Sequence, residues 1–568
     1  MTTMNGAELI INLLERHNIT TIAGIPGGAN LPLYDALRSS TTIHHVLCRH
    51  EQGAGFIAQG IARSTGRPGV CFATSGPGAT NILTAIADAY LDSVPMLCIT
   101  GQVPKSLIGT DAFQEVDTYG MSIPITKHNF LIRSAEQIPD ILQRAFTIAT
   151  QGRPGPVVID VPKDVQLQRI TLEQIPVCTT PPTASSCSSD AVGTAAAMIN
   201  AARKPILYLG GGVISSGAHG AVRRLIDKNG LPATMTLMGL GAIPSDHPGA
   251  LGMLGMHAAR STNMALEECD LLIAAGVRFD DRATGKVSEF CPNADVIHMD
   301  IDPSEVHKLK RANVALVGDL AECLEQLLPL IEARHRTGWH QHITELKERY
   351  PLTIPEAMVP QKPYGLIRKV ADLVGDDVIV TTDVGKHQMW TAQVYPFSRP
   401  RQFLTSGGLG TMGFGLPAAI GAALAHPDRL VICFTGDGSL QMNIQELATV
   451  VEQQLNIKII VLNNTSLGLV RQQQGLFYNN NHFASDYTID IDFATIARGF
   501  GMKSVDFKFS PLAGELLQDA IASPGPCLIN VPIDKEEEVY PMVPPGAANN
   551  TMIGGYSNPV EPALASEE

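Results

Sequence analysis

Residues 431–464 read VICFTGDGSLQMNIQELATVVEQQLNIKIIVLNN, the pattern of a β-strand, a helix and a second β-strand. The first apolar run, 430–434, leads into Gly436-Asp437-Gly438, and the second, 457–462, ends at Asn463-Asn464. In an open parallel sheet the carboxyl ends of such strands meet at one edge, where ligands bind. Asp437 and Asn464 are therefore expected to lie together, although they are far apart in the chain.

The residue types at this edge are suited to a metal bound to a diphosphate. A carboxylate, an amide oxygen and phosphate oxygens are ligands that octahedral Mg²⁺ prefers. Glycines let the backbone approach a phosphate, and the start of the following helix offers free N–H groups. The alternative interpretation is an ordinary tight turn followed by an ordinary strand end.

Similar strand-like runs recur along the chain in three series that alternate with helical patterns, which is typical of doubly wound parallel sheets. We therefore predict an α/β protein with three doubly wound parallel-sheet domains. The runs are 69–73, 95–100 and 157–161 in the first series, 206–209, 271–275 and 296–299 in the second, and 378–382, 430–434, 457–462 and 527–531 in the third.

Two stretches without periodicity separate the series. Residues 171–190 are rich in Thr, Pro and Ser, and residues 332–363 are rich in charge and Pro, so both are predicted to be linkers. From about Glu536 onward, Pro and Gly predict an extended segment that is ordered only on contact. The predicted domains are 1–170, 190–335 and 362–540, followed by a tail at 541–568.

Composition excludes several classes of function. With 568 residues, 45% apolar and 17% charged, the chain is long and apolar enough for several buried cores. A net charge of −14 without basic runs argues against nucleic acid as a partner. The most apolar long segment, 413–425, is too short to span a bilayer, so we expect no membrane partner.

The N-terminus and the cysteines predict a cytoplasmic location. The chain begins with a helical pattern capped by Asn5 with Glu8 three residues on, rather than with a secretion signal. The ten cysteines are scattered without a CxxC pair, and we expect them to be buried free thiols in a reducing compartment.

The GDG and NN pair resembles the diphosphate signature of thiamin diphosphate (ThDP) enzymes. With RHEQGAGF at 49–56, SGPGATN at 75–81, LGMLGMH at 251–257 and RFDDR at 278–282, in this order, the chain resembles the large, catalytic subunits of the acetohydroxyacid (acetolactate) synthase family, in particular the enterobacterial isozyme I type. The resemblance covers residues 6–545 and implies the pyruvate oxidase/decarboxylase-like architecture.

The resemblance implies the following roles at ThDP. Glu51 would hydrogen-bond N1′ of the pyrimidine, Met412 would bend the cofactor, and the Gly410 carbonyl would hold the aminopyrimidine. Gln114 would lie beside the reacting centre, and Lys163 at the substrate entrance. Further ThDP contacts are expected from Gly76, Pro77, Gly78, Asn81, Gly436, Gly438 and Ser439, and Mg²⁺ is expected on Asp437, Asn464 and the backbone oxygen of Ser466.

The same resemblance implies a structural FAD in the second domain. Arg278 and Arg282 would bind phosphate, and Asp300 would accept from ribose or ribityl hydroxyls. The remaining expected FAD residues are Arg153, Gly210, Gly211, Gly212, Thr236, Leu237, Leu254, Gly255, Met256, His257, Gly276, Asp280 and Asp319.

Each motif also has an ordinary structural interpretation. Glu51 could be a favourable charge at a helix start, Met412 a core filler and His257 a core histidine. The glycines at 210–212 could end a strand for packing reasons, and RFDDR could be an exposed cluster. Only their joint occurrence in family order favours the site.

The implied reaction decarboxylates pyruvate and adds the resulting two-carbon unit to a second 2-oxo acid, pyruvate or 2-oxobutyrate. The products would be 2-acetolactate or 2-aceto-2-hydroxybutyrate, in the first common step of branched-chain amino-acid biosynthesis. Gln473 replaces a Trp that most family members place against the ethyl group of the second substrate. We therefore predict a weak preference between the two acceptors, because apolar contact with one methylene is lost.

The family implies a homodimer or dimer of dimers, with ThDP bound between two chains, and a small regulatory subunit. The competing interpretations are pyruvate oxidase and glyoxylate carboligase, which are also FAD-containing ThDP enzymes. Glu51 argues against the carboligase, and LGMLGMH with RFDDR argues against the oxidase. A noncatalytic scaffold predicts a broken motif, and the motifs are intact.

Overall fold

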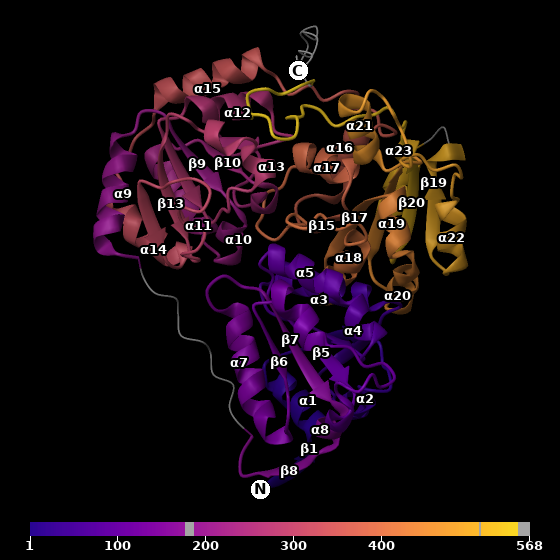
Figure 1. Cartoon of the computed structure of the whole chain (residues 1–568). Helices are drawn as coiled ribbons and strands as arrows, with labels where there is room; N and C mark the ends of the chain where they lie inside the picture. The colour runs from indigo at the N-terminus through magenta and orange to yellow at the C-terminus, as the bar shows by residue number, and fades with distance from the viewer. Residues whose placement is uncertain (176–186, 510–512, 555–568) are drawn as a thin grey trace. The chain divides into compact units, whose positions relative to one another are not determined.

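The computed structural model describes residues 1–175, 187–509 and 513–554, which belong to two compact units (Figure 1). The first unit comprises Met1–Thr183, Asp372–Gln388 and Arg401–Lys535, and the second comprises Ala184–Ala371, Met389–Pro400 and Glu536–Glu568. The N-terminal and C-terminal strand series thus share one unit, and the central series forms the other.

The first unit begins with a six-stranded parallel sheet in the order β3-β2-β4-β5-β7-β6. Its strands are β2 (Thr21–Gly24), β3 (His44–Leu47), β4 (Gly69–Ala73), β5 (Met96–Gln102), β6 (His128–Leu131) and β7 (Pro156–Pro162). A short antiparallel pair, β1 (Thr2–Asn5) and β8 (Arg169–Leu172), lies beside it. The main helices are α1 (Gly6–Arg16), α2 (Leu31–Arg38), α3 (Glu51–Thr65), α4 (Pro77–Asn81), α5 (Leu83–Leu91), α6 (Thr118–Ser122), α7 (Ile138–Thr150) and α8 (Lys163–Leu167).

The same unit contains a second six-stranded parallel sheet in the order β16-β15-β17-β18-β20-β19. Its strands are β15 (Val378–Thr382), β16 (Phe403–Leu404), β17 (Leu430–Gly436), β18 (Ile457–Asn463), β19 (Lys503–Asp506) and β20 (Cys527–Pro532). The helices of this region that belong to the first unit are α18 (Gly415–Ala425), α19 (Asp437–Met442), α20 (Leu447–Glu452), α21 (Gly468–Phe477), α22 (Phe493–Gly499) and α23 (Ala513–Ala522). Helices α16 (Pro363–Val374) and α17 (Lys386–Val394) are divided between the two units.

Helices α3 and α18 join the two sheets of the first unit, because apolar residues of both helices belong to one buried cluster with residues of both sheets. Gly60 and Gly421 lie where the backbones come closest. A Cβ atom at Gly60 would collide with the carbonyl of Ala418, and one at Gly421 with the carbonyl of Ile57. Only glycine permits this close backbone contact.

The second unit contains a third six-stranded parallel sheet in the order β11-β10-β9-β12-β13-β14. Its strands are β9 (Pro205–Leu209), β10 (Ala233–Met235), β11 (Ala250–Met253), β12 (Leu271–Ala275), β13 (Asp295–Asp300) and β14 (Val314–Val317). The helices are α9 (Ser189–Ala201), α10 (Gly211–Ser215), α11 (His219–Asn229), α12 (Arg260–Glu268), α13 (Asp281–Thr284), α14 (Leu320–Leu327) and α15 (Thr337–Arg349). The predicted architecture of three parallel sheets is confirmed.

The second linker was predicted too long, because residues 332–363 contain α15. Trp339, Ile343 and Leu346 are buried in the core of the second unit, and Trp339 Nε1 donates to the Pro205 carbonyl at 3.0 Å. Their spacing of four and three residues forms one apolar helix face. The surrounding charges, which cover the solvent side of the helix, concealed this pattern.

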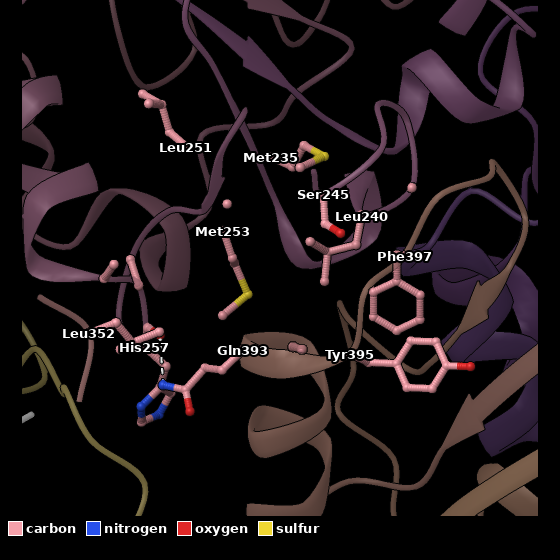
Figure 2. A pocket seen from close by; sticks show the side chains of 15 residues that line it. Met235, Leu240, Ser245, Leu251, Met253, His257, Leu352, Gln393, Tyr395 and Phe397 are labelled. Atoms are coloured by element: carbon pink, nitrogen blue, oxygen red, sulfur yellow. Dashed lines mark hydrogen bonds between the residues drawn. The ribbon is translucent and has the colours of Figure 1, made fainter. Parts of the chain in front are cut away.

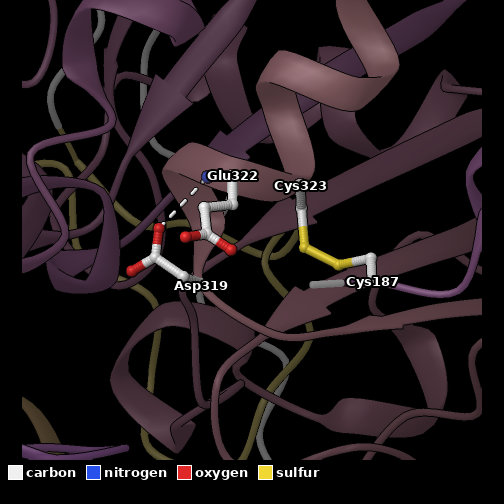
Figure 3. Close-up of a disulfide and its surroundings, with 4 residues drawn as sticks. All are labelled: Cys187, Asp319, Glu322 and Cys323. Atoms are coloured by element: carbon white, nitrogen blue, oxygen red, sulfur yellow. Dashed lines mark hydrogen bonds between the residues drawn. A yellow bond between two sulfur atoms is a disulfide. The ribbon is translucent and has the colours of Figure 1, made fainter. Parts of the chain in front are cut away.

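The free-thiol prediction is wrong for two of the ten cysteines. Cys187 and Cys323 form a disulfide with a Cα–Cα distance of 5.6 Å, which joins the residues just before α9 to α14 (Figure 3). Cys178 lies outside the described residues. The other cysteines are free and buried, namely Cys48, Cys71, Cys98, Cys269, Cys291, Cys433 and Cys527.

The C-terminal segment packs on loops of the second unit. Met542 pairs with Ile553 and Gly285 pairs with Ala548 in short antiparallel bridges. The Val543 N–H donates to the Met256 carbonyl at 2.8 Å. In Figure 1 this yellow segment passes close to α12. Residues 541–554 therefore lie against the loops that carry several of the predicted FAD residues.

The other strand and helix predictions agree closely with the structure. All ten listed runs are strands, and the Asn5–Glu8 capping box at α1 is confirmed. Two helices, α4 and α5, follow the SGPG motif and meet at Ile82. In the part of the chain that the structure describes, no helix is long and apolar enough to cross a membrane.

Candidate active site

Asp437 lies where β17 ends and α19 begins, beside the end of the neighbouring parallel strand β18. The residue is only 3% exposed, and its carboxylate accepts hydrogen bonds from the backbone N–H groups of Asn464 and Ser466. The Ser466 N–H also donates to Asn464 Oδ1 at 3.2 Å. The structure therefore brings together the three residues predicted to bind Mg²⁺.

The chemistry of this group fits a hard cation. Burial raises the pKa of the Asp437 carboxyl to about 6, and the N–H donors offset this only in part. A bound cation would favour the charged form. Among the residues that the structure describes, no three His, Cys, Asp or Glu side chains gather as a metal site. The predicted set instead consists of one carboxylate, one amide oxygen and one backbone oxygen, which suits Mg²⁺ with phosphate oxygens.

Met412 reaches the turn that carries Asp437. A Cβ atom at Gly438 would lie 3.5 Å from Met412 Cε and 2.7 Å from the Tyr487 hydroxyl, so any larger residue there would have to displace the Tyr487 side chain. Burial, and secondly the charge of Asp437, raises the pKa of Tyr487. Ser439 Oγ donates to the Val384 carbonyl at 2.9 Å. Tyr487 was not predicted, because it lies in an irregular loop without a motif.

Asp383 and His387 also lie at this edge and were not predicted. Asp383 follows β15, and its carboxylate accepts from the N–H groups of Gly413 at 2.7 Å and Gly415 at 3.2 Å. It thus holds the chain on both sides of Phe414 and directly after Met412. Burial raises the pKa of Asp383 to about 6 and lowers the pKa of His387 to about 3. The acid at the end of the predicted strand 378–382 was the signal that could have identified Asp383.

Glu51 is the first residue of α3 and is 9% exposed. Its Oε2 accepts from Asn81 Nδ2 at 2.9 Å, and a Cβ atom at Gly78 would lie 3.3 Å from Oε1. The structure thus brings Glu51 to the SGPG loop. Within residues 1–175, 187–509 and 513–554, no hydrogen bond joins Glu51 to Asp437 or Asn464.

Gln114 packs on the same loop. A Cβ atom at Gly76 would lie 2.9 Å from Gln114 Cα, and Gln114 itself adopts a left-handed φ of 59°. Gln102 at the end of β5 donates to the Val116 carbonyl at 3.0 Å, and this bond fixes the chain two residues after Gln114. Lys163 begins α8 directly after the adjacent strand β7. These residues therefore occupy the carboxyl edge of one parallel sheet.

Glu446 supports the turn before Glu51 and was also not predicted. Its buried Oε1 accepts from the backbone N–H groups of Arg49 at 2.9 Å and His50 at 3.1 Å. Burial raises the pKa of Glu446. Its sequence position inside a helical pattern gave no indication of this contact with another domain.

In the second unit, predicted FAD residues follow five adjacent parallel strands. Gly210 follows β9 and Gly276 follows β12, at the point where the strand order reverses, which is where ligands of such sheets bind. Thr236 follows β10, Asp300 ends β13, and Asp319 caps α14 after β14 (Figure 3). These residues therefore share one edge of the sheet.

The glycines at 210–212 also have a packing role. The Gly212 N–H donates to the Gly276 carbonyl at 3.1 Å, and a Cβ atom at Gly212 would lie 2.6 Å from Gly276 Cα. Gly211 and Leu237 lie near the same strand ends, and both are half-buried. Both interpretations of this glycine run, as a packing contact and as a cofactor loop, are compatible with this geometry.

The LGMLGMH and RFDDR loops lie together. The Met256 N–H donates to the Arg282 carbonyl at 2.9 Å, and Arg282 Nη1 lies 3.8 Å from Met256 Sδ. Asp280 caps α13 through the Ala283 N–H. Arg278 is half-buried and Arg282 is exposed, so guanidinium groups are available at this end of the sheet. Gly255 has a left-handed φ of 91°, and Leu254 is buried beside it.

A cavity of about 130 Å³ lies next to His257 in the second unit (Figure 2). Its lining is mostly apolar and includes Met235, Leu240, Met253 and Phe397. His257 Nδ1 contacts the Pro541 carbonyl at 3.1 Å, and burial lowers the pKa of His257 to about 4.

Thr236 provides an observation that favours a ligand at the sheet edge. Its Oγ1 atom is buried and has no hydrogen-bond partner among the described residues, although buried hydroxyls normally have one. An orphaned buried hydroxyl at the carboxyl edge of the sheet fits the presence of a polar ligand such as a dinucleotide.

Two predicted site residues lie apart from these groups in the sequence. Arg153 belongs to the first unit, where its Nε donates to Ser93 Oγ at 2.8 Å. Gln473 is half-buried in α21, two residues after Arg471, which forms an ion pair with Asp486 at 3.1 Å.

Comparison with known proteins identifies the class. Residues 4–121 match the N-terminal TPP binding domain of thiamine pyrophosphate enzymes, residues 192–327 their central domain, and residues 383–531 their C-terminal TPP binding domain. The chain is thus a thiamine pyrophosphate enzyme by its domains, and thiamine pyrophosphate is another name for the predicted ThDP.

The chain is 60% identical to the acetolactate synthase isozyme 1 large subunit of Escherichia coli K12, over 97% of both chains. It is 48% identical to the isozyme 2 large subunit of the same organism, over 97% of this chain and 99% of the relative. It is 46% identical to the acetolactate synthase large subunit of Parasynechococcus marenigrum, over 98% and 92%. The chain belongs to the acetolactate synthase large-subunit family, and the predicted likeness to isozyme 1 is confirmed.

Proposed function

We propose that this chain catalyses the acetolactate synthase reaction, in which pyruvate is decarboxylated and the two-carbon unit is transferred to pyruvate or 2-oxobutyrate. The products are 2-acetolactate and 2-aceto-2-hydroxybutyrate, intermediates of valine, leucine and isoleucine biosynthesis. The observation that carries the proposal is the likeness to acetolactate synthase large subunits over nearly the whole chain.

Bound ThDP supplies the carbon nucleophile and the electron sink of this reaction. Asp437, Asn464 and the backbone oxygen of Ser466 would hold Mg²⁺, and Gly436, Gly438 and Ser439 would border the diphosphate. The proximity of Asp437, Asn464 and Ser466 at the ends of β17 and β18 supports this assignment.

At the other end of the cofactor, Glu51 would hold a proton at N1′ of the pyrimidine, with Gly76, Pro77, Gly78 and Asn81 around it. The hydrogen bond from Asn81 orients the carboxylate of Glu51. Met412 and the Gly410 carbonyl would fix the bend of the cofactor. No side chain of the protein is needed as a nucleophile, so the chain contributes positioning, proton placement and exclusion of water.

Gln114 and Lys163 would border the substrate, and Gln473 would face the second 2-oxo acid. The packing of Gln114 against Gly76 supports this assignment. The half-buried position of Gln473 leaves it able to contact a substrate.

We propose FAD as a structural cofactor of the second unit. This assignment is supported by Gly210, Thr236, Gly276 and Asp300, which lie at the ends of adjacent strands. It is also supported by the buried hydroxyl of Thr236, which has no hydrogen-bond partner among the described residues. Arg278, Arg282 and Arg153 would serve its phosphates and ring system, as the family resemblance implies. The other residues that the resemblance implies at FAD remain predictions.

We further propose a homodimer or dimer of dimers, with ThDP between the first domain of one chain and the third of the other. A small regulatory subunit is the expected partner, because the relatives are named large subunits. We place the enzyme in the cytoplasm and keep the domain bounds 1–170, 190–335 and 362–540 as predictions.

The test is an assay of the purified protein with pyruvate, with and without ThDP, Mg²⁺ and FAD. Acetolactate is expected only in the mixture that contains ThDP and Mg²⁺, and omission of FAD is expected to reduce its formation. Acetyl phosphate and hydrogen peroxide, measured in parallel, are expected to stay absent. A complete mixture that forms no acetolactate would contradict the proposal.

A further inference from the structure

A buried ion network in the first unit connects α3 and α5 to the chain at 405–411. Arg63 in α3 lies 3.0 Å from Asp88 and 2.8 Å from Asp92, and neither carboxylate is exposed. The same guanidinium donates to the Thr405 carbonyl at 3.0 Å and to Gln59 Oε1 at 2.8 Å. Buried charges are costly unless they are paired and hydrogen-bonded, so this network has a defined geometry.

The two carboxylates hold the loop at 406–411 through four hydrogen-bond donors of that loop. Asp92 accepts from the backbone N–H groups of Gly407 at 3.0 Å and Gly408 at 2.7 Å. Asp88 accepts from Ser406 Oγ and, at 3.0 Å, from Thr411 Oγ1. Hydrogen bonds to a charged acceptor are roughly twice as strong as neutral ones.

The loop leads directly to the residues proposed to bend ThDP. Gly410 lies between Gly408, whose N–H is held by Asp92, and Thr411, whose hydroxyl is held by Asp88. Met412 follows Thr411 directly. The Thr411 N–H donates to Ser406 Oγ at 2.9 Å, which closes the loop on itself. On its other side, Met412 is followed by Gly413, whose N–H is held by Asp383 at 2.7 Å. Met412 is therefore fixed from both sides by buried carboxylates.

We propose that Asp88 and Asp92, which share the single guanidinium of Arg63, are positioning residues that set the conformation of Gly410 and Met412 for the cofactor. This inference rests on the proposed function for the role of those two residues. Glu51 and Arg63 belong to the same helix, about 18 Å apart along its axis at 1.5 Å per residue. In the proposed dimer, one first domain thus contributes Glu51 to one site and orients Met412 of the other.

The test compares Asp92→Asn with Asp140→Asn as the matched control. Asp140 forms an exposed ion pair with Arg144 at 3.3 Å in the same domain. Removal of this ion pair is therefore expected to change neither the hydrogen exchange of residues 404–414 nor the affinity for ThDP. In Asp92→Asn, hydrogen exchange of the peptide covering 404–414 is expected to accelerate about tenfold or more in the cofactor-free protein, because a buried charged acceptor is lost. Exchange in α7 is expected to stay unchanged.

Calorimetric titration with ThDP and Mg²⁺ is expected to give an affinity about tenfold weaker for Asp92→Asn than for the wild type and the control. Unchanged exchange at 404–414 together with unchanged ThDP affinity would overturn the inference. If Asp92→Asn does not fold, Ser406→Ala replaces it as the test variant, because it removes only one hydroxyl of the loop. This variant is expected to accelerate hydrogen exchange at residue 411 and to lower the affinity for ThDP.

The two proposals fail in different ways. If the wild type forms no acetolactate in the complete mixture, the proposed function fails, whereas the exchange measurement still reports on the network. If the wild type is active and the Asp92→Asn protein matches it in exchange and in ThDP affinity, only the positioning role fails.

Discussion

Glu51 carries the proton placement in the proposed mechanism, and its carboxylate accepts a hydrogen bond from Asn81 at 2.9 Å. We expect Glu51→Gln to lower kcat for acetolactate formation by about 100-fold or more, because a general acid–base group contributes about 10²–10⁴-fold. Thermal unfolding is expected to change little, because the amide oxygen can still accept from Asn81. Initial rates with pyruvate measure the effect.

Glu136→Gln is the control, since Glu136 is an exposed acid of the same sheet domain that accepts from Gln168 at 3.1 Å. It is expected to retain wild-type activity. A Glu51→Gln enzyme within tenfold of the wild type would show that Glu51 is merely a helix-capping charge.

Gln473 offers a second residue-scale prediction. Gln473→Trp is expected to raise the ratio of 2-aceto-2-hydroxybutyrate to 2-acetolactate about fourfold when both acceptors compete, since one buried methylene is worth about 0.8 kcal/mol. Product analysis by chromatography gives the ratio. Gln474→Trp and Gln441→Trp are not suitable controls, because Gln474 holds Phe483 and Ser485 and Gln441 donates to the Asp437 carbonyl at 3.0 Å. Gln518→Trp, at an exposed position of α23, is preferable. An unchanged ratio in Gln473→Trp would place residue 473 away from the acceptor.

The disulfide gives the clearest prediction at the scale of an element, because it joins the residues just before α9 to α14 across 136 positions. Thiol titration of the unfolded, unreduced protein is expected to give eight groups, namely the seven free cysteines of the described residues and Cys178, which the sequence predicts to be free. Cys323→Ser is expected to give nine and to lower the free energy of unfolding by about 2–4 kcal/mol. Ten reactive groups in the unreduced wild type would contradict the disulfide.

The sequence predicted some elements better than others for physical reasons. Long strands buried on both faces, such as β17 and β18, appear as continuous apolar runs and were located to within two residues. Short strands such as β10, with three residues, and β16, with two, carry too little pattern to detect. Helix α15 was missed because charged residues surround its apolar face.

The site shows the same division. Residues in motifs, such as Asp437 and Glu51, were predicted because their spacing is characteristic. Asp383, Glu446 and Tyr487 act through contacts that only the folded chain reveals, since their partners are distant in sequence. The Asp88–Arg63–Asp92 network was invisible for the same reason.

At the scale of the whole molecule, the buried carboxyl of Asp437 links stability to pH and to metal. Burial raises its pKa from the ordinary 3.8 of an Asp carboxyl to about 6 in the folded protein, so folding favours its protonated form. The resulting stability is complete below about pH 4 and is lost as pH rises through 6. Relative to Asp437→Asn, the metal-free wild type is expected to become less stable by at most about 3 kcal/mol between pH 4 and 7.

Thermal unfolding of both proteins across this range measures the difference, in which the contributions of other titrating groups cancel. Addition of Mg²⁺ and ThDP at pH 7 is expected to raise Tm of the wild type, by mass action, and to leave Tm of Asp437→Asn nearly unchanged. A difference between the two proteins that is constant with pH would contradict the raised pKa.

The packing of the C-terminal segment on the second unit also has a consequence for biosynthesis. His257 and Pro541 are in contact although 284 positions separate them. A ribosome that adds about 5–20 residues per second needs about 15–60 s to cover that interval. The central sheet can fold early, but its loops at 254–257 and 280–286 gain their final neighbours only when synthesis is nearly complete. Loading of a flavin at those loops is therefore expected to follow release of the chain.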